Sequence, residues 1–301
     1  MLHLLNILTG KEKEMAPPPV SDRYRKSFEL FRSLIDEQGL IQLILVLARA
    51  KPAARVSVKQ QLSQELQNIL SLAGLFPCPS QFYVKSFGLR GAGYTYSKTR
   101  KRLKGYDDIY IYFSYDRKIS EKLRDSEARE DEGEFGKLLG YPECCIKHYN
   151  RQKFVKPGDY SLSCFKRPAL KPWPYLNNAL LWVYGLKIID HFPCRPDCIR
   201  SLRINRRYLK VLEKCDPRYA DFLKTQLKSL VLCSRAGEVI YSTKYRKTDR
   251  GLVVEEIRGD RRDPLYELVK KKGSLRIVSP HTYEIGDRKL FWPEVEAAIF
   301  E

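Results

Sequence analysis

Hydrophobic positions in the first quarter of the chain recur at intervals of three and four residues. One such face runs from residue 28 to residue 34, and similar apolar stretches follow at 39–49 and 57–72. This period is typical of amphipathic helices. The pattern predicts a helical region of three helices over residues 21–75. It follows a proline-rich lead-in over residues 1–20, which we expect to be mobile.

From residue 76 onward, the three- and four-residue spacing of apolar positions ends, and aromatic and β-branched residues become frequent. The runs FYVKSF (82–87) and DIYIYFSY (108–115) predict strands, and the charged segment 118–134 predicts a helix. Three more helices are predicted by the apolar patterns that follow, over residues 176–189, 198–214 and 220–230. We assign residues 76–229 to one central domain.

The pattern of apolar and polar residues changes again over residues 230–301. Short alternating runs such as VLCS, EVIYSTKY, GLVVEEIR and SLRIVS are separated by turn residues, and a short helix is expected after Pro293. The predicted fold class is therefore α+β. It has an N-terminal helical layer, a central mixed α/β domain that contains the cysteines, and a small β-rich unit over residues 230–301.

The composition is unusual in its charge. The 301 residues include 55 Lys and Arg against 36 Asp and Glu, a net charge of +19. Such a positive field favours polyanionic partners, either nucleic acid or an anionic membrane surface. The apolar stretch at 39–50 is shorter than the ~20 residues that a membrane span needs, so no transmembrane span is expected.

The N-terminal residues lack the basic start and the cleavage site of a signal peptide. We therefore expect a cytoplasmic protein. In that reducing compartment, neighbouring cysteines are more often metal ligands or redox groups than disulfides.

Two cysteine-containing segments, called windows below, share one short motif. LGYPECCIKHY (139–149) and HFPCRPDCIRS (191–201) both contain proline, then a carboxylate, then cysteine. Proline suits the first position of a helix, and an acid beside it complements the positive end of the helix dipole. Both phrases therefore predict helix starts, at which a thiolate is favoured over a thiol.

Sulfur and imidazole ligands suit zinc or an iron–sulfur cluster and suit magnesium or calcium poorly. The candidate metal ligands are the four cysteines of the two windows, with two histidines as replacements: Cys144, Cys145, Cys194, Cys198, His148 and His191. Glu143 and Asp197 are acids that can orient a histidine or accept a proton. Their plainer role is to cap their own helices.

These windows also resemble a known family. The phrase LLGYPECCI (138–146), followed by HFPCxxDCxxS (191–201), is similar to the uncharacterised prokaryotic family called domain of unknown function 483. The resemblance covers residues 105–215. It implies no activity, cofactor or ligand set, but it implies that the two windows work as one unit.

Two groups of basic residues are candidates for anion binding. One group lies on one face of the helix predicted after Cys198: Arg200, Arg203, Arg206, Arg207 and Lys210. The other belongs to the glycine-rich stretch GLRGAGYTYSKTRKRLKG (88–105): Lys98, Arg100, Lys101 and Arg102. Such groups suit phosphate or single-stranded nucleic acid. A solvated helix face and an ordinary charged hairpin loop are the alternatives.

Three functions fit these observations. The first is a metal-binding protein, with zinc or an iron–sulfur cluster, whose basic surface receives a phosphate-bearing or nucleic-acid substrate. It is an enzyme of RNA or nucleotide metabolism if the metal keeps an open coordination position. The second is a non-catalytic nucleic-acid-binding protein with a structural zinc site. The third is a metal-free dithiol oxidoreductase that uses Cys144 or Cys145. The sequence does not decide between them.

Overall fold

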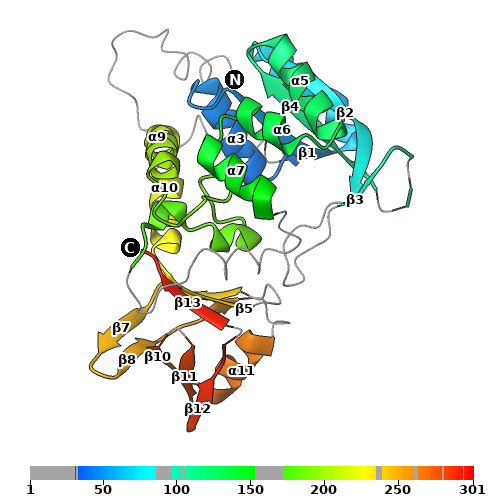
Figure 1. Ribbon diagram of the computed structural model, residues 1–301. Helices are drawn as coiled ribbons and strands as arrows, with labels where there is room; N and C mark the ends of the chain where they lie inside the picture. Colours follow the sequence, from blue (N-terminus) through cyan, green and yellow to red (C-terminus); the bar gives the residue numbers. More distant parts are fainter. Residues whose placement is uncertain are drawn as a thin grey trace. The chain divides into compact units, whose positions relative to one another are not determined.

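The computed structural model describes residues 31, 33–85, 97–101, 103–104, 106–152, 172–234, 239–259, 264–279, 281–293 and 295–301. The fold is α+β, as predicted, and the chain forms two compact units (Figure 1). The first unit is drawn from residues 1–87, 96–150 and 206–220. The second is drawn from 88–95, 151–205 and 221–301.

A four-stranded antiparallel sheet forms the core of the first unit. Its order is β1 (Ala53–Lys59), β4 (Asp108–Ser114), β2 (Phe76–Lys85) and β3 (Ser97–Thr99). Central strand β4 is buried along almost its whole length, which explains its run of aromatic and β-branched residues. The helices of this part of the chain are α3 (Glu37–Leu47), α4 (Ser63–Leu72), α5 (Arg117–Ala128), α6 (Glu132–Leu138) and α7 (Glu143–Gln152).

These elements confirm the strands predicted around 82–87 and 108–115 and the helix predicted over 39–49. The helix predicted over 57–72 is wrong in its first part. Residues Ala53–Lys59 form strand β1, which pairs with β4, and helix α4 begins only at Ser63 after the short 3₁₀ turn η1 (Gln60–Leu62). Val56 and Val58 alternate with more exposed residues, so period two prevails over the helical period.

Two antiparallel sheets build the C-terminal part of the second unit. One has the order β13 (Val295–Ile299), β5 (Leu230–Ser234), β6 (Val239–Ser242) and β9 (Arg258–Gly259). The other has the order β12 (Arg288–Phe291), β11 (Thr282–Ile285), β10 (Leu275–Ser279), β8 (Gly251–Val254) and β7 (Tyr245–Thr248). Residues of both sheets and of helix α11 (Pro264–Lys272) share one hydrophobic core. The short strands predicted after residue 230 are thus present.

Two predicted helices of this unit are wrong. The apolar stretch 176–189 forms two short 3₁₀ turns instead, η2 (Tyr175–Asn177) and η3 (Leu180–Tyr184). The last segment, expected as a helix after Pro293, is strand β13, which is buried and pairs with β5. Ala and Glu in that segment favour a helix locally, but pairing with a buried neighbour decides its conformation.

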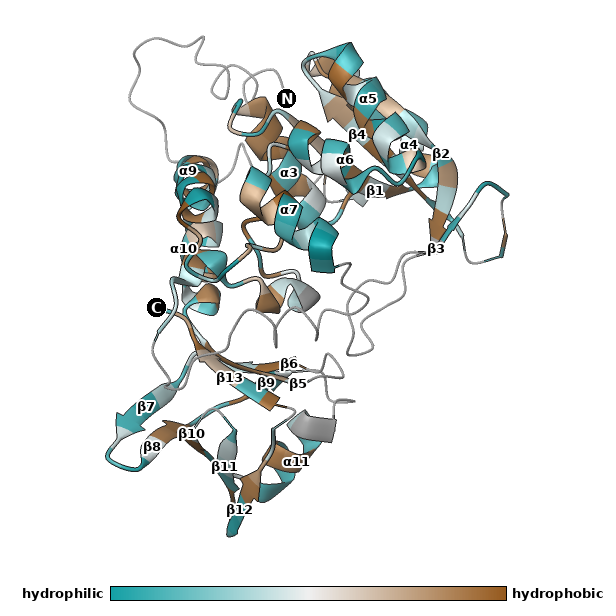
Figure 2. Cartoon of the chain, in the orientation of Figure 1, coloured by the Kyte–Doolittle hydropathy of each residue, from teal (hydrophilic) through white to brown (hydrophobic). Residues whose placement is uncertain are grey.

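Helices α9 (Ile199–Cys215) and α10 (Pro217–Leu227) agree with prediction to within a few residues. Helix α9 is amphipathic. Leu202, Leu209 and Leu212 are buried on one side, while the opposite side is hydrophilic (Figure 2). Among the described residues, no helix is both long and apolar enough to cross a membrane.

Candidate metal centre

The first cysteine pair is placed by the turn that joins α6 to α7. Gly140 has a φ of 78°, a left-handed conformation that glycine adopts without strain, and it ends α6. Pro142 follows, and its carbonyl accepts hydrogen bonds from the N–H groups of Cys145 and Ile146. The sequence LGYPECC therefore encodes a helix end, a tight turn and a new helix start. Cys144 and Cys145 lie in the first turn of α7.

The second pair lies on the loop that leads into α9. The N–H of Cys198 donates to the carbonyl of Arg195, which closes a tight turn, and the Cys198 carbonyl accepts the N–H of Leu202. Cys198 is thus the residue immediately before α9, as the Pro-Asp-Cys phrase indicates. Cys194 precedes the turn and is half-buried, whereas Cys198 is buried.

A fully buried asparagine holds this loop in place. The side-chain NH₂ of Asn177 donates to the carbonyls of Pro196 (2.9 Å) and Cys198 (3.3 Å). Its side-chain oxygen accepts from Ser201 Oγ (2.9 Å) and Asn205 Nδ2 (2.8 Å) on α9. All the hydrogen-bonding positions of the amide are used. One side chain therefore ties the cysteine loop to the first two turns of α9.

His191 extends this network on the other side of the loop. Its Nε2 lies 3.1 Å from Ser201 Oγ. The two atoms lie within hydrogen-bond distance, and the Ser201 hydroxyl also donates to Asn177 Oδ1. Residues on both sides of Cys194 are consequently anchored to one buried polar cluster.

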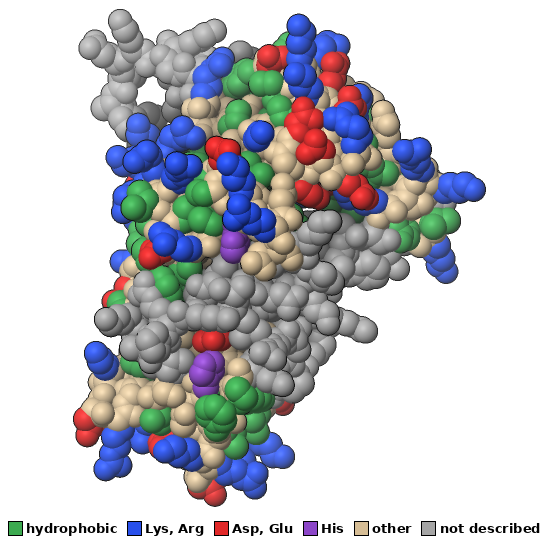
Figure 3. All heavy atoms as spheres, in the orientation of Figure 1, with side chains coloured by type: hydrophobic (Ala, Val, Ile, Leu, Met, Phe, Trp, Pro, Cys, Tyr) green, Lys and Arg blue, Asp and Glu red, His purple; other side chains and the backbone are tan. Residues whose placement is uncertain are grey.

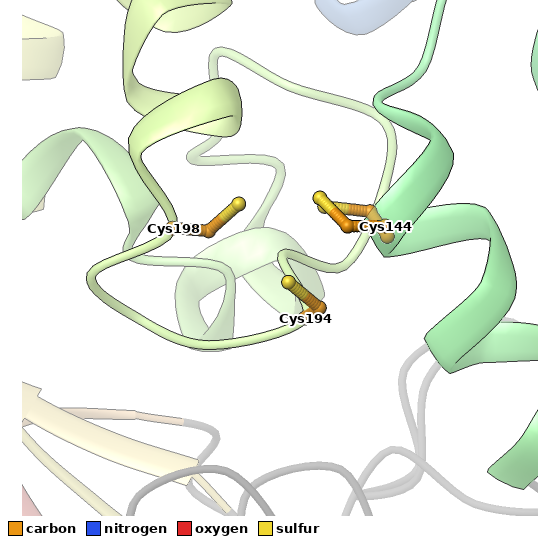
Figure 4. A group of neighbouring side chains, drawn as sticks. Cys144, Cys194 and Cys198 are labelled. Atoms are coloured by element: carbon orange, nitrogen blue, oxygen red, sulfur yellow. The ribbon is translucent and has the colours of Figure 1, made fainter.

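The structure brings the four predicted cysteines together. The sulfur atoms of Cys144, Cys145, Cys194 and Cys198 all lie within 4.8 Å of one another. Figure 4 shows Cys144 on α7, Cys194 on the loop and Cys198 at the start of α9, with their side chains directed toward a common centre. The group can hold a metal ion.

The spacing of the sulfurs bears on what the group can hold. In a tetrahedral zinc site with Zn–S bonds of ~2.3 Å, neighbouring sulfurs lie about 3.8 Å apart. The Sγ atoms of Cys144 and Cys145 are 3.9 Å apart. In a four-iron cluster the cysteine sulfurs lie roughly 6 Å apart, because iron–iron edges separate them. Sulfurs within 4.8 Å of one another can share one metal ion.

Two helix N-termini lie at this group of sulfurs. Cys144 and Cys145 lie in the first turn of α7, and Cys198 immediately precedes α9, so both helix N-termini meet the sulfurs. The partial positive charge of a helix N-terminus stabilises a thiolate. Two such ends offset part of the excess negative charge that four thiolates leave around a divalent ion.

Other candidates of the two windows are placed differently. Among the described residues, neither His148 nor His191 belongs to the sulfur group, and their role as replacement ligands stays a prediction. Glu143 forms an exposed ion pair with Lys147, and Asp197 pairs with Arg195. These acids have charged partners on their own helix or loop.

Three further described cysteines are buried away from the group. Burial raises the pKa of Cys215 to about 11 and also raises the pKa of Cys78. Cys233 is buried in β5. A thiol with a raised pKa stays protonated and makes a poor metal ligand. The seven described cysteines are free of disulfides, and Cys164 lies outside the described residues.

The two predicted anion-binding groups differ in their surroundings. All five basic residues of α9 are exposed. In the second group, Lys98 forms an ion pair with buried Glu127 at 3.0 Å, whereas Arg100 and Lys101 are exposed. Arg102 and most of the glycine-rich stretch lie outside the described residues. The anion-binding role of both groups remains a prediction.

Asn177 is not among the residues that the sequence pattern singles out. It lies in PYLNNALLW, where two adjacent amides interrupt an apolar run. Buried amides of this kind need several hydrogen-bond partners, so such a pair is a usable sign of a structural hub.

Replacing Asn177 by leucine should weaken the cysteine site. Four buried polar groups then lose a partner, and we expect a loss of about 3 kcal/mol or more in the free energy of unfolding. Zinc affinity should fall about 10–100-fold, as for other groups that orient metal ligands. Urea denaturation and competition with a chromophoric zinc chelator measure the two effects.

The neighbouring Asn178 provides the control. It is equally buried, but its side chain donates to the Leu227 carbonyl and to Ser229. Asn178→Leu should destabilise the protein and leave zinc affinity unchanged. Equal zinc affinities for the two variants would contradict the positioning role of Asn177.

Comparisons with known proteins add no relative. No family model, no curated protein and no solved structure matches the chain.

Proposed function

We propose that the chain is a nucleic-acid-binding protein built around a single structural zinc ion, held by Cys144, Cys145, Cys194 and Cys198. The observation that carries this proposal is the convergence of four sulfurs within 4.8 Å. Four thiolates in tetrahedral geometry are typical of structural zinc sites. The resemblance to the family of domain of unknown function 483 is consistent with two windows that act as one unit.

The number of thiolates argues against a catalytic metal. Catalytic zinc sites keep a coordination position open for water or substrate, usually with three protein ligands. Here four sulfurs are available to one ion, and two of them, from Cys145 and Cys198, belong to buried residues. We therefore propose that the ion links distant parts of the sequence and that no reaction takes place on it.

The dithiol alternative has less support. The sulfurs of Cys144 and Cys145 are 3.9 Å apart, without a disulfide between them, a separation that suits both a reduced dithiol and a metal-bound pair. A dithiol oxidoreductase needs only one cysteine pair. The presence of Cys194 and Cys198 in the same group favours a metal.

Nucleic acid is the proposed partner because of charge. The chain carries a net charge of +19, and contact with several phosphates predicts an affinity that falls steeply as salt rises. Binding of the whole protein to RNA that shows no salt dependence would contradict this part of the proposal.

Metal analysis of protein purified without oxygen tests the centre directly. We expect about one zinc ion per chain, because one tetrahedral ion uses all four sulfurs, and a colourless solution. Brown protein with iron and absorbance near ~400 nm would contradict the single-zinc site in favour of a cluster. Protein that holds neither metal would contradict a metal centre and favour the dithiol.

A further inference from the structure

Resting on the proposed function, the geometry points to one surface that binds the nucleic acid. We propose that the α9 basic stripe binds the sugar–phosphate backbone of a nucleic-acid strand without reading its sequence. The stripe consists of five residues on one face of α9: Arg200, Arg203, Arg206, Arg207 and Lys210.

The stripe carries positive charge that the rest of the described structure leaves uncompensated. All five side chains are exposed, and none forms an ion pair with a described carboxylate. Figure 3 shows Lys and Arg side chains gathered over α9. On a helix, residues three or four apart have Cβ atoms ~5–6 Å apart. That spacing is close to the spacing of neighbouring phosphates on one strand, so several side chains can contact successive phosphates.

Several other basic residues of the described structure are paired with acids. Lys98 is paired with Glu127, which is 7% exposed. In the C-terminal unit, Lys244 pairs with Glu256, and Arg246 lies 3.8 Å from Glu255. Such pairs reduce the potential that a phosphate meets. The α9 basic stripe has no acids interleaved among its exposed positions, and it is therefore a stronger phosphate site than these paired residues.

The side chains of the stripe favour nucleic acid over a membrane surface. Four of the five are arginine, whose planar fork binds phosphate through two parallel hydrogen bonds. A helix that lies on a membrane buries a broad apolar face in the lipid. On α9, Leu202, Leu209 and Leu212 are buried within the protein, Ile204 and Val211 are half-buried, and Ile199 is 68% exposed.

The amide and hydroxyl side chains of α9 do not face a ligand. Asn205 and Ser201 are the residues of these types that could pair with base edges. Both are fully buried and hydrogen-bonded to Asn177. Contacts to phosphate position a protein on nucleic acid but carry no sequence information. The phosphate contacts proposed for the stripe are therefore independent of sequence.

The test compares two variants with the same loss of charge. Arg203→Gln/Arg207→Gln removes two charges from the stripe, and Lys244→Gln/Arg246→Gln removes two paired charges from the C-terminal unit. Binding to fluorescein-labelled oligouridylate is measured by anisotropy against salt. For the stripe variant we expect an affinity about 10-fold lower and a log–log salt slope smaller by about 1.4, since each lost phosphate contact on a single strand contributes about 0.7.

The control variant should bind like the wild type. Equal losses in both variants would overturn the assignment, because net charge alone would then explain binding. An oligonucleotide of mixed sequence should bind as tightly as oligouridylate, and a strong preference for either would contradict backbone recognition. Tighter binding to vesicles of phosphatidylcholine and phosphatidylserine, lost in the stripe variant, would overturn nucleic acid as the ligand.

Zinc content is measured on every preparation. Absence of zinc from the wild type contradicts the proposed function, whatever the RNA result. Full zinc content together with unchanged RNA affinity in the stripe variant contradicts nucleic-acid binding by the α9 basic stripe. That result does not contradict the metal centre.

Discussion

Replacing Cys198 by serine is expected to abolish stable metal binding and to unfold much of the chain around the site. Structural zinc in zinc-finger peptides contributes about 10–16 kcal/mol of binding free energy. Whole domains are stable by only about 5–15 kcal/mol. A hydroxyl is a far weaker zinc ligand than a thiolate, so loss of one of four sulfurs removes a large part of that contribution.

The position of Cys198 in the chain increases the effect. Its carbonyl accepts hydrogen bonds from both Leu202 and Asn177, so it begins α9 and belongs to the buried polar cluster. When the metal is lost, the first turn of α9 loses an anchor. Arg200 and Arg203 lie in that part of the helix, and we therefore expect weaker RNA binding as well.

Calorimetry and metal analysis measure the outcome. A suitable control is Cys215→Ala, which removes a buried thiol whose pKa is raised by burial and which lies outside the sulfur group. Its expected cost is about 1 kcal/mol, typical of a small core truncation, with full zinc content. Retention of zinc by Cys198→Ser, or a melting temperature equal to that of the control, would contradict the structural site.

The site was predictable from sequence because its chemistry is local. Proline followed by an acid and a cysteine fixes a helix start and the electrostatics of the thiol, and both starts occur as expected, at Glu143 and just after Cys198. The composition of the ligand set also follows from the windows. The distance between the two pairs does not, because it depends on the packing of segments fifty residues apart.

Elements defined by distant pairing were predicted poorly. Strand β1 has an apolar pattern that also fits a helix, and its seven-residue register with β4 decides the conformation. Strand β13 is decided in the same way by β5. The hydrogen-bonding role of Asn177 was not predicted, for a related reason. Its partners lie between 19 and 28 residues farther along the chain, and no local pattern shows them.

Glu127 is the second position at which a large effect is expected. Its carboxylate is buried and accepts from Arg55 Nη1 (2.6 Å), Lys98 Nζ (3.0 Å) and the Tyr112 hydroxyl (2.9 Å). Replacing it by glutamine removes the charge that both cations face. Breaking a buried ion pair in this way costs about 3–5 kcal/mol, because the remaining charges are left without compensation.

Glu134→Gln is the matched control. That residue lies near Glu127 in sequence and pairs with Arg129 at 2.8 Å, but the pair is exposed. Exposed ion pairs contribute about 0–1 kcal/mol. Urea denaturation near neutral pH should therefore separate the two variants by several kcal/mol. Equal midpoints would show that the network around Glu127 does not stabilise the fold.

The same carboxylate predicts how stability depends on pH. Burial tends to raise the pKa of Glu127, but Arg55 and Lys98 outweigh it, and the pKa is lowered from its usual value of 4.5. A lowered pKa in the folded state means that the unfolded chain binds the proton first. The contribution is therefore complete above about pH 4.5 and is lost as the pH falls through the folded-state value. Wild-type unfolding free energy should drop in acid more steeply than that of Glu127→Gln. Parallel pH profiles for the two proteins would contradict this origin of acid sensitivity.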